Sequence, residues 1–337
     1  MFDKLIAKVK ENPKTIVFTE GVDARIQEAA SKLLAEKLMG VILVGVVDEV
    51  KKTAAERGFD ISGAQIIDPA TYEGMDEMVD AMVALRKSKM SPEDCHANLL
   101  KGNYFGTMLV KMGKADCRLG GATYSTADTI RPALQLVKTK PGAHLVSSCF
   151  ILNREDGPEE LRTIAMGDCA INIDYQDTVD KEGNVTFTAG EKLAEVAEEI
   201  YKVAPVFGID PKLAMLSFST KGSGKGGTVS LSQAAIKVLK EKHPDWNADG
   251  EMQFDAAVSP VVGQLKFPGS PVAGYANTFI FPNIEAGNIG YKIAQRLGGF
   301  AAYGPILQGL NAPINDLSRG CNADEVYKMA IITVALA

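Results

Sequence analysis

The sequence predicts an α/β protein built from two α/β domains. Two observations lead to this prediction. Short β-rich runs alternate with helical patterns through short connections, which is typical of a parallel sheet with helices on both faces. The chain also has 337 residues, which exceeds the usual size of a single domain. Parallel sheets bind ligands at the carboxyl ends of their strands, so functional residues are expected there.

The first domain follows from the alternation in the N-terminal part of the chain. A short amphipathic helix comes first, and Gly40 and Gly58 each end a later predicted helix. A helix with a basic last turn, a longer helix and a brief strand then lead to Gly120-Gly121. The predicted strands are residues 15–19, 41–44, 65–67 and 115–117, and the predicted helices are residues 24–39, 48–57, 75–89 and 98–112.

Around Pro141-Gly142 the pattern changes to strands joined by hairpin-type turns, which indicates a second, more β-rich domain. The last segment alternates like the first half, so the C-terminal portion is expected to return to the N-terminal domain. The predicted domains are residues 1–147 with 304–337, and residues 148–303. In the second domain the predicted strands are 144–152, 162–173, 213–218 and 276–282, and the predicted helices are 191–204 and 285–297.

Charge and composition exclude several classes of protein. The chain has 36 Lys and Arg against 42 Asp and Glu, which gives a net charge of −6. This charge does not indicate a protein that binds nucleic acid or an anionic membrane. No apolar run approaches the roughly 20 residues that span a bilayer. The N-terminus lacks the apolar core of a signal peptide, so a cytoplasmic protein is predicted. Five scattered cysteines and three isolated histidines predict neither a disulfide framework nor a metal site.

The densest group of reactive side chains lies in residues 311–325, ahead of an apolar helix. Ser318-Arg319-Gly320 has the composition of a tight turn. A guanidinium there can grip a phosphate, and successive N–H groups can form an anion-binding nest. Asp324 and Glu325 follow at the start of the helix. The alternative is structural, because Asn322 and Glu325 have the spacing of a capping box, which needs no function.

A second group follows Gly120-Gly121, where Ser125 and Thr126 open a helix whose N–H groups and hydroxyls can cradle an anion. Arg131 precedes a proline, which disfavours helical geometry at Arg131 and indicates a helix boundary. Arg86 lies in the basic last turn of a predicted helix, where such a residue commonly complements the helix dipole. For each arginine, phosphate binding and a purely structural role both stay open.

The glycine-rich segment 221–227 has some features of a nucleotide-binding P-loop. That motif needs glycine at position 219 and a hydroxyl residue at position 226, whereas the chain has Ser219 and Gly226. A nucleoside triphosphatase is therefore rejected. A basic loop beside phosphates and a mobile surface loop both remain open.

Four blocks carry a resemblance to a known family. They are S-T-A-D-T-I-R-P-A-L-Q (125–135), S-F-S-T-K-G-S-G (217–224), F-P-N-I-E-A-G-N-I-G-Y-K-I-A-Q-R-L-G-G (281–299) and P-I-N-D-L-S-R-G-C-N-A-D-E-V (313–326). The chain resembles the phosphate acetyltransferases (phosphotransacetylases) over essentially its whole length, from E-G-V-D-A-R near residue 20 to the end.

The resemblance implies an acyltransferase of acetate metabolism that moves an acetyl group reversibly between acetyl phosphate and coenzyme A. Coenzyme A is then a substrate, and no metal or permanently bound cofactor is implied. The family also implies a homodimer of chains with two α/β domains. Their sheet architecture would be like that of the isocitrate and isopropylmalate dehydrogenases, with a central cleft that holds the active site.

Carried over by position, the resemblance implies a role for each candidate residue. Ser318 would hydrogen-bond near the thiol of coenzyme A, and Arg319 would bind acetyl phosphate and stabilise the charge that develops on its carbonyl. Arg86 and Arg131 would bind phosphate. The family's proposed base, a carboxylate seven residues after the motif serine, falls on Glu325. The adjacent Asp324 leaves open which acid takes the thiol proton.

We expect direct attack of the thiolate in a ternary complex without an acyl-enzyme, so Cys321 is predicted to be structural. Three alternatives remain. The first is a transferase for butyryl or propionyl phosphate. The second is an NAD-dependent hydroxy-acid dehydrogenase of related fold, which would need a compact set of metal-binding carboxylates that the sequence lacks. The third is a non-catalytic sensor of coenzyme A or phosphate, which the grouping of serine, arginine and acid in one motif disfavours.

Overall fold

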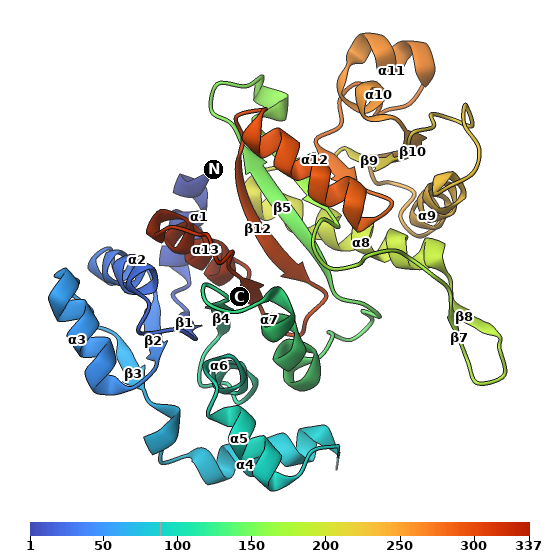
Figure 1. Ribbon diagram of the computed structural model, residues 1–337. Helices are drawn as coiled ribbons and strands as arrows, with labels where there is room; N and C mark the ends of the chain where they lie inside the picture. The colour runs from blue at the N-terminus through green and yellow to red at the C-terminus, as the bar shows by residue number, and fades with distance from the viewer. Residues whose placement is uncertain (88) are drawn as a thin grey trace. The chain divides into compact units, whose positions relative to one another are not determined.

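The computed structural model describes residues 1–87 and 89–337. These residues form two compact units (Figure 1). The first unit comprises residues 2–142 and 310–337, and the second comprises residues 143–309 together with Met1. Within the described ranges, no helix combines the length and apolarity needed to cross a membrane. The predicted helix 75–89 includes Ser88, which lies outside the described residues; the observed helix ends at Arg86.

The first unit contains a five-stranded sheet in the order β13-β4-β1-β2-β3, and every neighbouring pair in it is parallel. β4 therefore lies between β1 and β13, two strands from opposite ends of the chain. The carboxyl ends of all strands meet at one edge of the sheet. The strands are β1 (Thr15–Phe18), β2 (Gly40–Val44), β3 (Gln65–Ile67), β4 (Cys117–Gly120) and β13 (Ile314–Asp316).

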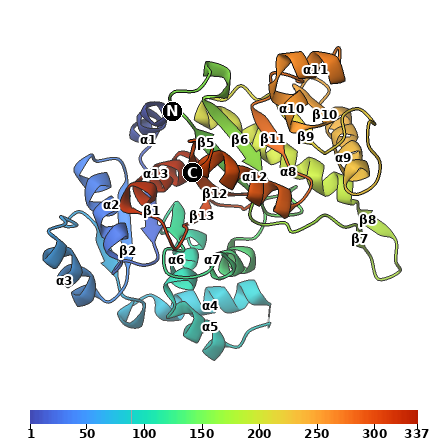
Figure 2. The ribbon, with the colours of Figure 1, turned by 45° about the horizontal axis from the view of Figure 1, so that its top comes forward.

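Helices cover both faces of this sheet. Val17 belongs to a core that includes Phe105 and Met108 of α6. Because side chains alternate along a strand, Ile16 and Phe18 point to the opposite face, where α13 packs against β1 and α2 (Figures 1 and 2). The helices are α1 (Phe2–Glu11), α2 (Ala24–Ala35), α3 (Val47–Arg57), α4 (Met75–Arg86), α5 (Pro92–Leu99), α6 (Gly102–Lys111), α7 (Thr126–Pro132), continued by a π-helical turn at Ala133–Val137, and α13 (Ala323–Ala335).

Three predictions for this unit need correction. The single helix predicted for residues 98–112 is broken into α5 and α6 at Lys101, which has extended backbone angles. Gly102 then allows α6 to approach β1, because a Cβ there would lie 2.2 Å from the carbonyl oxygen of Thr19. The strand predicted at 115–117 lies at Cys117–Gly120. The prediction ended too early because Arg118, a charged residue that is fully buried, interrupts the apolar pattern of the strand. β13 was absent from the predicted strands.

The second unit contains a six-stranded mixed sheet in the order β10-β9-β11-β6-β5-β12. The first four of these strands are parallel, whereas β5 pairs antiparallel with both β6 and β12. The strands are β5 (Ser147–Asn153), β6 (Thr163–Gly167), β9 (Leu213–Leu216), β10 (Ala248–Met252), β11 (Thr278–Ile280) and β12 (Ala301–Gln308), with a separate hairpin of β7 (Thr178–Val179) and β8 (Val185–Phe187).

The helices of the second unit confirm the two that were predicted and add three. The predicted helices 191–204 and 285–297 correspond to α8 (Ala189–Val203) and α12 (Ile284–Arg296). The strand predicted for 162–173 ends at Gly167, because the buried Asp168 carboxylate accepts hydrogen bonds from the backbone N–H groups of residues 170–172 and folds them into a loop. The additional helices are α9 (Val229–Lys242), α10 (Phe254–Val258) and α11 (Pro260–Lys266).

Candidate active site

The predicted site residues of the 311–325 stretch lie at the carboxyl edge of the five-stranded sheet. Three adjacent strands, β13, β4 and β1, end there in parallel. The segments that follow them are residues 317–322, 121–126 and 19–25, which lie far apart in sequence. This is the edge at which parallel α/β sheets bind ligands.

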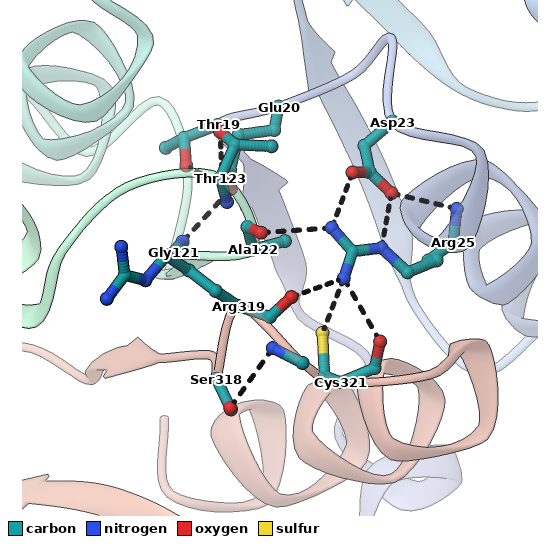
Figure 3. Close-up of polar contacts among 11 residues, drawn as sticks. Thr19, Glu20, Asp23, Arg25, Gly121, Ala122, Thr123, Ser318, Arg319 and Cys321 are labelled. Atoms are coloured by element: carbon teal, nitrogen blue, oxygen red, sulfur yellow. Dashed lines mark hydrogen bonds and ion pairs between the residues drawn. The ribbon is translucent and has the colours of Figure 1, made fainter.

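Glu20 links the loop after β1 to the loop after β4. Its carboxylate accepts hydrogen bonds from the backbone N–H of Gly121 at 3.0 Å and of Thr123 at 2.7 Å, and from the Thr123 hydroxyl at 2.9 Å (Figure 3). The N–H groups of Gly121 and Thr123 are therefore occupied by the chain's own carboxylate. The anion site expected at the start of the following helix, at Ser125 and Thr126, stays a prediction, and the sequence pattern gave no signal for Glu20.

Arg25 links all three loops. It is the second residue of α2, and its guanidinium donates to the Asp23 carboxylate, to the carbonyl of Ala122 and to the carbonyls of Arg319 and Cys321 (Figure 3). Burial acts to raise the pKa of Asp23, but the hydrogen bonds and charge of Arg25 outweigh it, so that pKa is lowered. The sequence motif E-G-V-D-A-R contained this residue, but its spacing alone assigned it no role.

The tight turn predicted at Ser318-Arg319-Gly320 is confirmed. The N–H of Cys321 donates to the carbonyl of Ser318 at 3.0 Å, and the N–H of Gly320 donates to the Ser318 hydroxyl at 3.2 Å. These two N–H groups are thus used inside the turn and do not form an open anion-binding nest. The Arg319 side chain is exposed and extends away from Arg25 (Figure 3). Within the described part of the chain, its guanidinium has no hydrogen bond or ion pair.

Thr126 bonds to the end of β13, and Ser125 caps α7. The Thr126 hydroxyl donates to the Asp316 carboxylate at 2.7 Å, and the Thr129 hydroxyl donates to the other oxygen at 2.6 Å. Burial raises the pKa of Asp316, which is 2% exposed, although these two hydrogen bonds oppose the shift. The Ser125 hydroxyl accepts from the N–H of Asp128 and donates to its carboxylate at 2.7 Å.

Arg118 supplies a buried positive charge beneath these loops. It is fully buried in β4 and donates to the carbonyl of Thr129 at 3.2 Å and to the Thr107 hydroxyl at 3.3 Å. Its charge acts to lower the pKa of Asp316. Burial raises the pKa of the neighbouring Tyr124 hydroxyl to about 12, so this group stays protonated. A buried charge needs such partners, because an unpaired one is costly in a low-dielectric interior.

The two candidate acids at the start of α13 have structural partners. Glu325 and Asn322 form the capping box that was the structural alternative, with the Asn322 N–H donating to Glu325 Oε2 at 3.0 Å. Asp324 forms an ion pair with Lys328 at 2.6 Å, one helical turn away. Glu325 Oε1 has no hydrogen-bond donor among the residues that are described, so one carboxylate oxygen of Glu325 remains available.

Arg86 and Arg131 both act electrostatically on Tyr104. Burial raises the pKa of Tyr104, and the positive charges of Arg131 and Arg86 both act in the opposite direction. The Nε of Arg86 is buried without a hydrogen-bond partner in the described residues, whereas Arg131 is largely exposed and forms an ion pair with Asp128 at 3.8 Å. Across residues 1–87 and 89–337, no hydrogen bond or ion pair joins either arginine to the turn that carries Arg319.

The glycine-rich loop of the second unit is held by Glu251. Its carboxylate accepts from the N–H of Gly222 at 2.7 Å and from the Ser219 hydroxyl at 2.8 Å. Burial would raise the pKa of Glu251, but these and further hydrogen bonds lower it overall. The loop therefore also has an internal carboxylate at its N–H groups. No cluster of metal-binding side chains is found in the described part of either unit.

Comparison with known proteins gives consistent matches over the whole chain. The family model for phosphate acetyl/butaryl transferase matches residues 1–334. The phosphate acetyltransferase of Bacillus subtilis (strain 168) is 50% identical over 339 residues, which cover 100% of this chain and 99% of the relative. The crystal structure of a phosphotransacetylase from Streptococcus pyogenes has a TM-score of 0.91 at 48% identity, with 99% of this chain and 97% of that chain covered. The EutD phosphotransacetylase from Staphylococcus aureus has a TM-score of 0.87 at 45% identity, with the same coverage.

We predict that the thiol of Cys321 reacts slowly despite its place beside the Arg319 turn. Cys321 is 6% exposed, and burial raises the pKa of its thiol to about 11, although Arg25 acts in the opposite direction. Only about one thiol in a thousand is then ionised at pH 8. Alkylation by iodoacetamide, followed by mass spectrometry of the Cys321 peptide, should be slow at neutral pH and should accelerate about tenfold per pH unit up to pH 10. Urea-unfolded protein is the control; equally fast labelling of the folded chain at pH 7 would contradict the prediction.

Proposed function

Because the chain belongs to the phosphate acetyl/butaryl transferase family, we propose that it is a phosphate acetyltransferase, which transfers acetyl groups reversibly between acetyl phosphate and coenzyme A. The observation that supports this most strongly is about 50% identity over the full chain to a relative with that name. The same matches favour acetyl transfer over a hydroxy-acid dehydrogenase or a non-catalytic sensor. Butyryl and propionyl transfer are less favoured, because the full-length relatives carry the acetyl name.

In the proposed reaction both substrates are bound at once. The thiolate sulfur of coenzyme A attacks the carbonyl carbon of acetyl phosphate and forms the C–S bond. The bond from that carbon to the bridging oxygen then breaks, and its electron pair leaves on phosphate. The thiol proton passes to a base. No acyl-enzyme forms, which is consistent with the protonated, buried thiol of Cys321.

Arg319 is proposed as the residue that binds the acyl phosphate and stabilises charge on the carbonyl oxygen. Its exposed guanidinium is free of protein partners in the described part of the chain, so all its donors are available to a ligand. A guanidinium can bind two phosphate oxygens at once. Ser318 is proposed to hydrogen-bond near the thiol of coenzyme A, and its hydroxyl, which already accepts from Gly320, keeps its own proton to donate.

Glu325 is proposed as the base in preference to Asp324. Asp324 is neutralised by Lys328 at 2.6 Å, whereas Glu325 has one oxygen outside its capping box. An ordinary thiol and an ordinary glutamate differ by about four pKa units, so the proton transfer costs roughly 6 kcal/mol. Alignment of two bound reactants supplies about 7–11 kcal/mol, which makes positioning the larger contribution.

Arg86 and Arg131 are proposed to bind phosphate groups of the substrates. The buried, unpartnered Nε of Arg86 supports this, because a ligand oxygen would satisfy it. Among the described residues, Arg131 would give up a long ion pair to Asp128 at 3.8 Å. Ser125 and Thr126 are also proposed to lie beside the substrate. Their hydroxyl groups already donate to carboxylates of the protein, so they would contact the substrate without donating a proton to it.

The cleft between two domains, the dehydrogenase-like architecture and the cytoplasmic location stay predictions.

A homodimer is also proposed, and the surface of the second unit supports it. Ile289 and Ile293 of α12 and Leu297, which caps that helix, follow one another at four-residue spacing and are 58%, 53% and 85% exposed. Val261 and Leu265 of α11 are 79% and 80% exposed. A hollow of about 480 Å³ with an apolar lining lies between α10 and α12. Apolar exposure on this scale is uncommon on a monomer, and a standard interface needs about 800 Å² from each partner.

The central test is an assay of the wild-type protein. Acetyl phosphate and coenzyme A should give a thioester and phosphate in equal amounts, which the absorbance of the thioester and a phosphate assay measure. Butyryl phosphate should react at least tenfold more slowly, and NAD with isocitrate should give no reaction. Preference for butyryl phosphate would replace the proposal by a butyryl transferase, and no thioester with either substrate would refute acyl transfer.

The Arg319→Ala variant is expected to lose turnover while it stays folded. The side chain is exposed and has no hydrogen bond or ion pair with the described residues, so the unfolding temperature should change little. Loss of a donor to the transition-state oxygen should lower kcat by about 100- to 1000-fold. Arg57→Ala, which removes an exposed arginine from the last turn of α3, is the matched control and should keep wild-type kcat. Wild-type turnover in Arg319→Ala would remove Arg319 from the mechanism.

The Ile289→Asp, Leu297→Asp double variant is expected to dissociate the homodimer. Sedimentation or light scattering should give the wild type twice the 36.0 kDa chain mass and the variant one chain mass. Charges at the centre of an apolar contact cannot pair and are costly to bury. Leu100→Asp, a change of an equally apolar residue that is 46% exposed in the first unit, should leave the mass doubled. A monomeric wild type, or a dimeric double variant, would contradict this surface.

A further inference from the structure

Arg25 is the most highly connected side chain at the carboxyl edge of the first sheet. It comes from the start of α2, whose N-cap Asp23 accepts a hydrogen bond from the Arg25 backbone N–H at 2.9 Å. From there the guanidinium reaches the loop after β4 and the turn after β13 (Figure 3). Its side chain is 30% exposed, so it borders solvent but is held by protein groups.

All donors of this guanidinium are used. An arginine side chain has five N–H donors. Nε donates to Asp23 Oδ1 at 3.0 Å, and Nη2 donates to Asp23 Oδ2 at 2.7 Å and to the Ala122 carbonyl at 2.9 Å. Nη1 donates to the carbonyls of Arg319 at 2.9 Å and Cys321 at 3.1 Å, with the Cys321 sulfur at 3.8 Å. No donor is left for a substrate phosphate, which distinguishes Arg25 from Arg319.

The contacts of Nη1 define the backbone of the turn that carries Arg319. They hold the carbonyls on both sides of Gly320, while the turn's own N–H groups bond internally to Ser318. The bond to Ala122 ties the same guanidinium to the loop after β4. Because the Asp23 carboxylate fixes the guanidinium plane by a bidentate pair, the turn is placed relative to α2 and β4 by one rigid group.

We propose that Arg25 is a positioning residue for acyl transfer, which acts through the turn of residues 318–321 and sets the direction from which Arg319 meets the acyl phosphate. The inference rests on the proposed function. It assigns Arg25 no contact with substrate. Its contribution is the alignment of the reacting groups, in which a displacement of about 1 Å costs on the order of 100-fold in rate.

The test compares Arg25→Ala and Arg25→Lys with wild type, with kcat and KM measured for acetyl phosphate and for coenzyme A. Both variants should lose on the order of 100-fold in kcat, while each KM stays within about threefold. Lysine should not rescue, because an ammonium has three donors and no planar fork to span Asp23, Ala122 and the turn. Added guanidinium at millimolar concentration should restore part of the kcat of Arg25→Ala and none of that of Arg25→Lys. Arg57→Ala is the control and should match wild type.

A double-mutant cycle separates positioning from independent binding. If Arg25 acts through Arg319, adding Arg25→Ala to Arg319→Ala should lower kcat by less than about threefold further. Full multiplication of the two losses would overturn the inference, as would a KM that rises more than tenfold with kcat retained, or wild-type kcat in Arg25→Lys. Thermal unfolding is measured alongside, and guanidinium rescue applies only to a folded variant. A wild-type enzyme that forms no thioester would refute the proposed function itself, whereas an active wild type with equally active Arg25 variants would refute only this inference.

Discussion

The parallel pairing of β4 with β1 on one side and β13 on the other is the constraint on which the site depends. It joins a strand from the beginning of the chain, a strand near residue 120 and a strand from the last 25 or so residues into one edge. Parallel strands end at the same edge, so their following loops must converge there. Glu20 and Arg25 then bond these loops together, and each does so with a charged group that accepts or donates several hydrogen bonds. Charge-assisted bonds of this kind are stronger than neutral ones and fix geometry more tightly.

Charge at this edge is balanced in layers. Arg118 and Asp316 lie buried below the loops. Arg118 donates to the Thr107 hydroxyl of α6 and the Thr129 carbonyl of α7, and Asp316 accepts from Thr126 and Thr129 of α7. In the loops themselves, the Glu20 carboxylate accepts hydrogen bonds from N–H groups of the loop after β4, and the Asp23 carboxylate neutralises the charge of Arg25. Arg319 is left as the guanidinium without a protein partner in the described chain. A cation without a neutralising partner attracts an anionic ligand more strongly than one that is paired with a carboxylate.

Much of the fold was predictable, whereas the roles of the candidate residues in the 311–325 stretch stay predictions. Strand 65–67 and the turn at Ser318-Arg319-Gly320 were predicted correctly, because buried β-rich runs and Ser-Arg-Gly composition are local signals. The capping box of Asn322 and Glu325 is local in the same way. Arg25 and Glu20 were missed as candidate site residues, since their partners in the other loops lie about 100 to 300 positions away in the chain and leave no spacing to detect. Arg118 was missed although its partners lie 11 positions away, because nothing in the local pattern indicates that this charged side chain is buried. β13 was missed because two of its three residues, Asn315 and Asp316, are polar, so the segment has no apolar β-rich run.

The sequence by itself determined the α/β class, many of the helices and strands with shifted ends, and the motif blocks that mark the family. These depend on apolar periodicity, capping residues and residue identity, all of which are written locally along the chain. Only the tertiary structure decided which hydrogen-bonding groups are used internally and which remain for a ligand. The composition of the loop after β4 predicts an anion-binding site in either case, whether its N–H groups bind a substrate or the Glu20 carboxylate. Hydrogen bonds are satisfied by whatever lies within about 3 Å, and that neighbourhood is set by strand pairing across the whole chain.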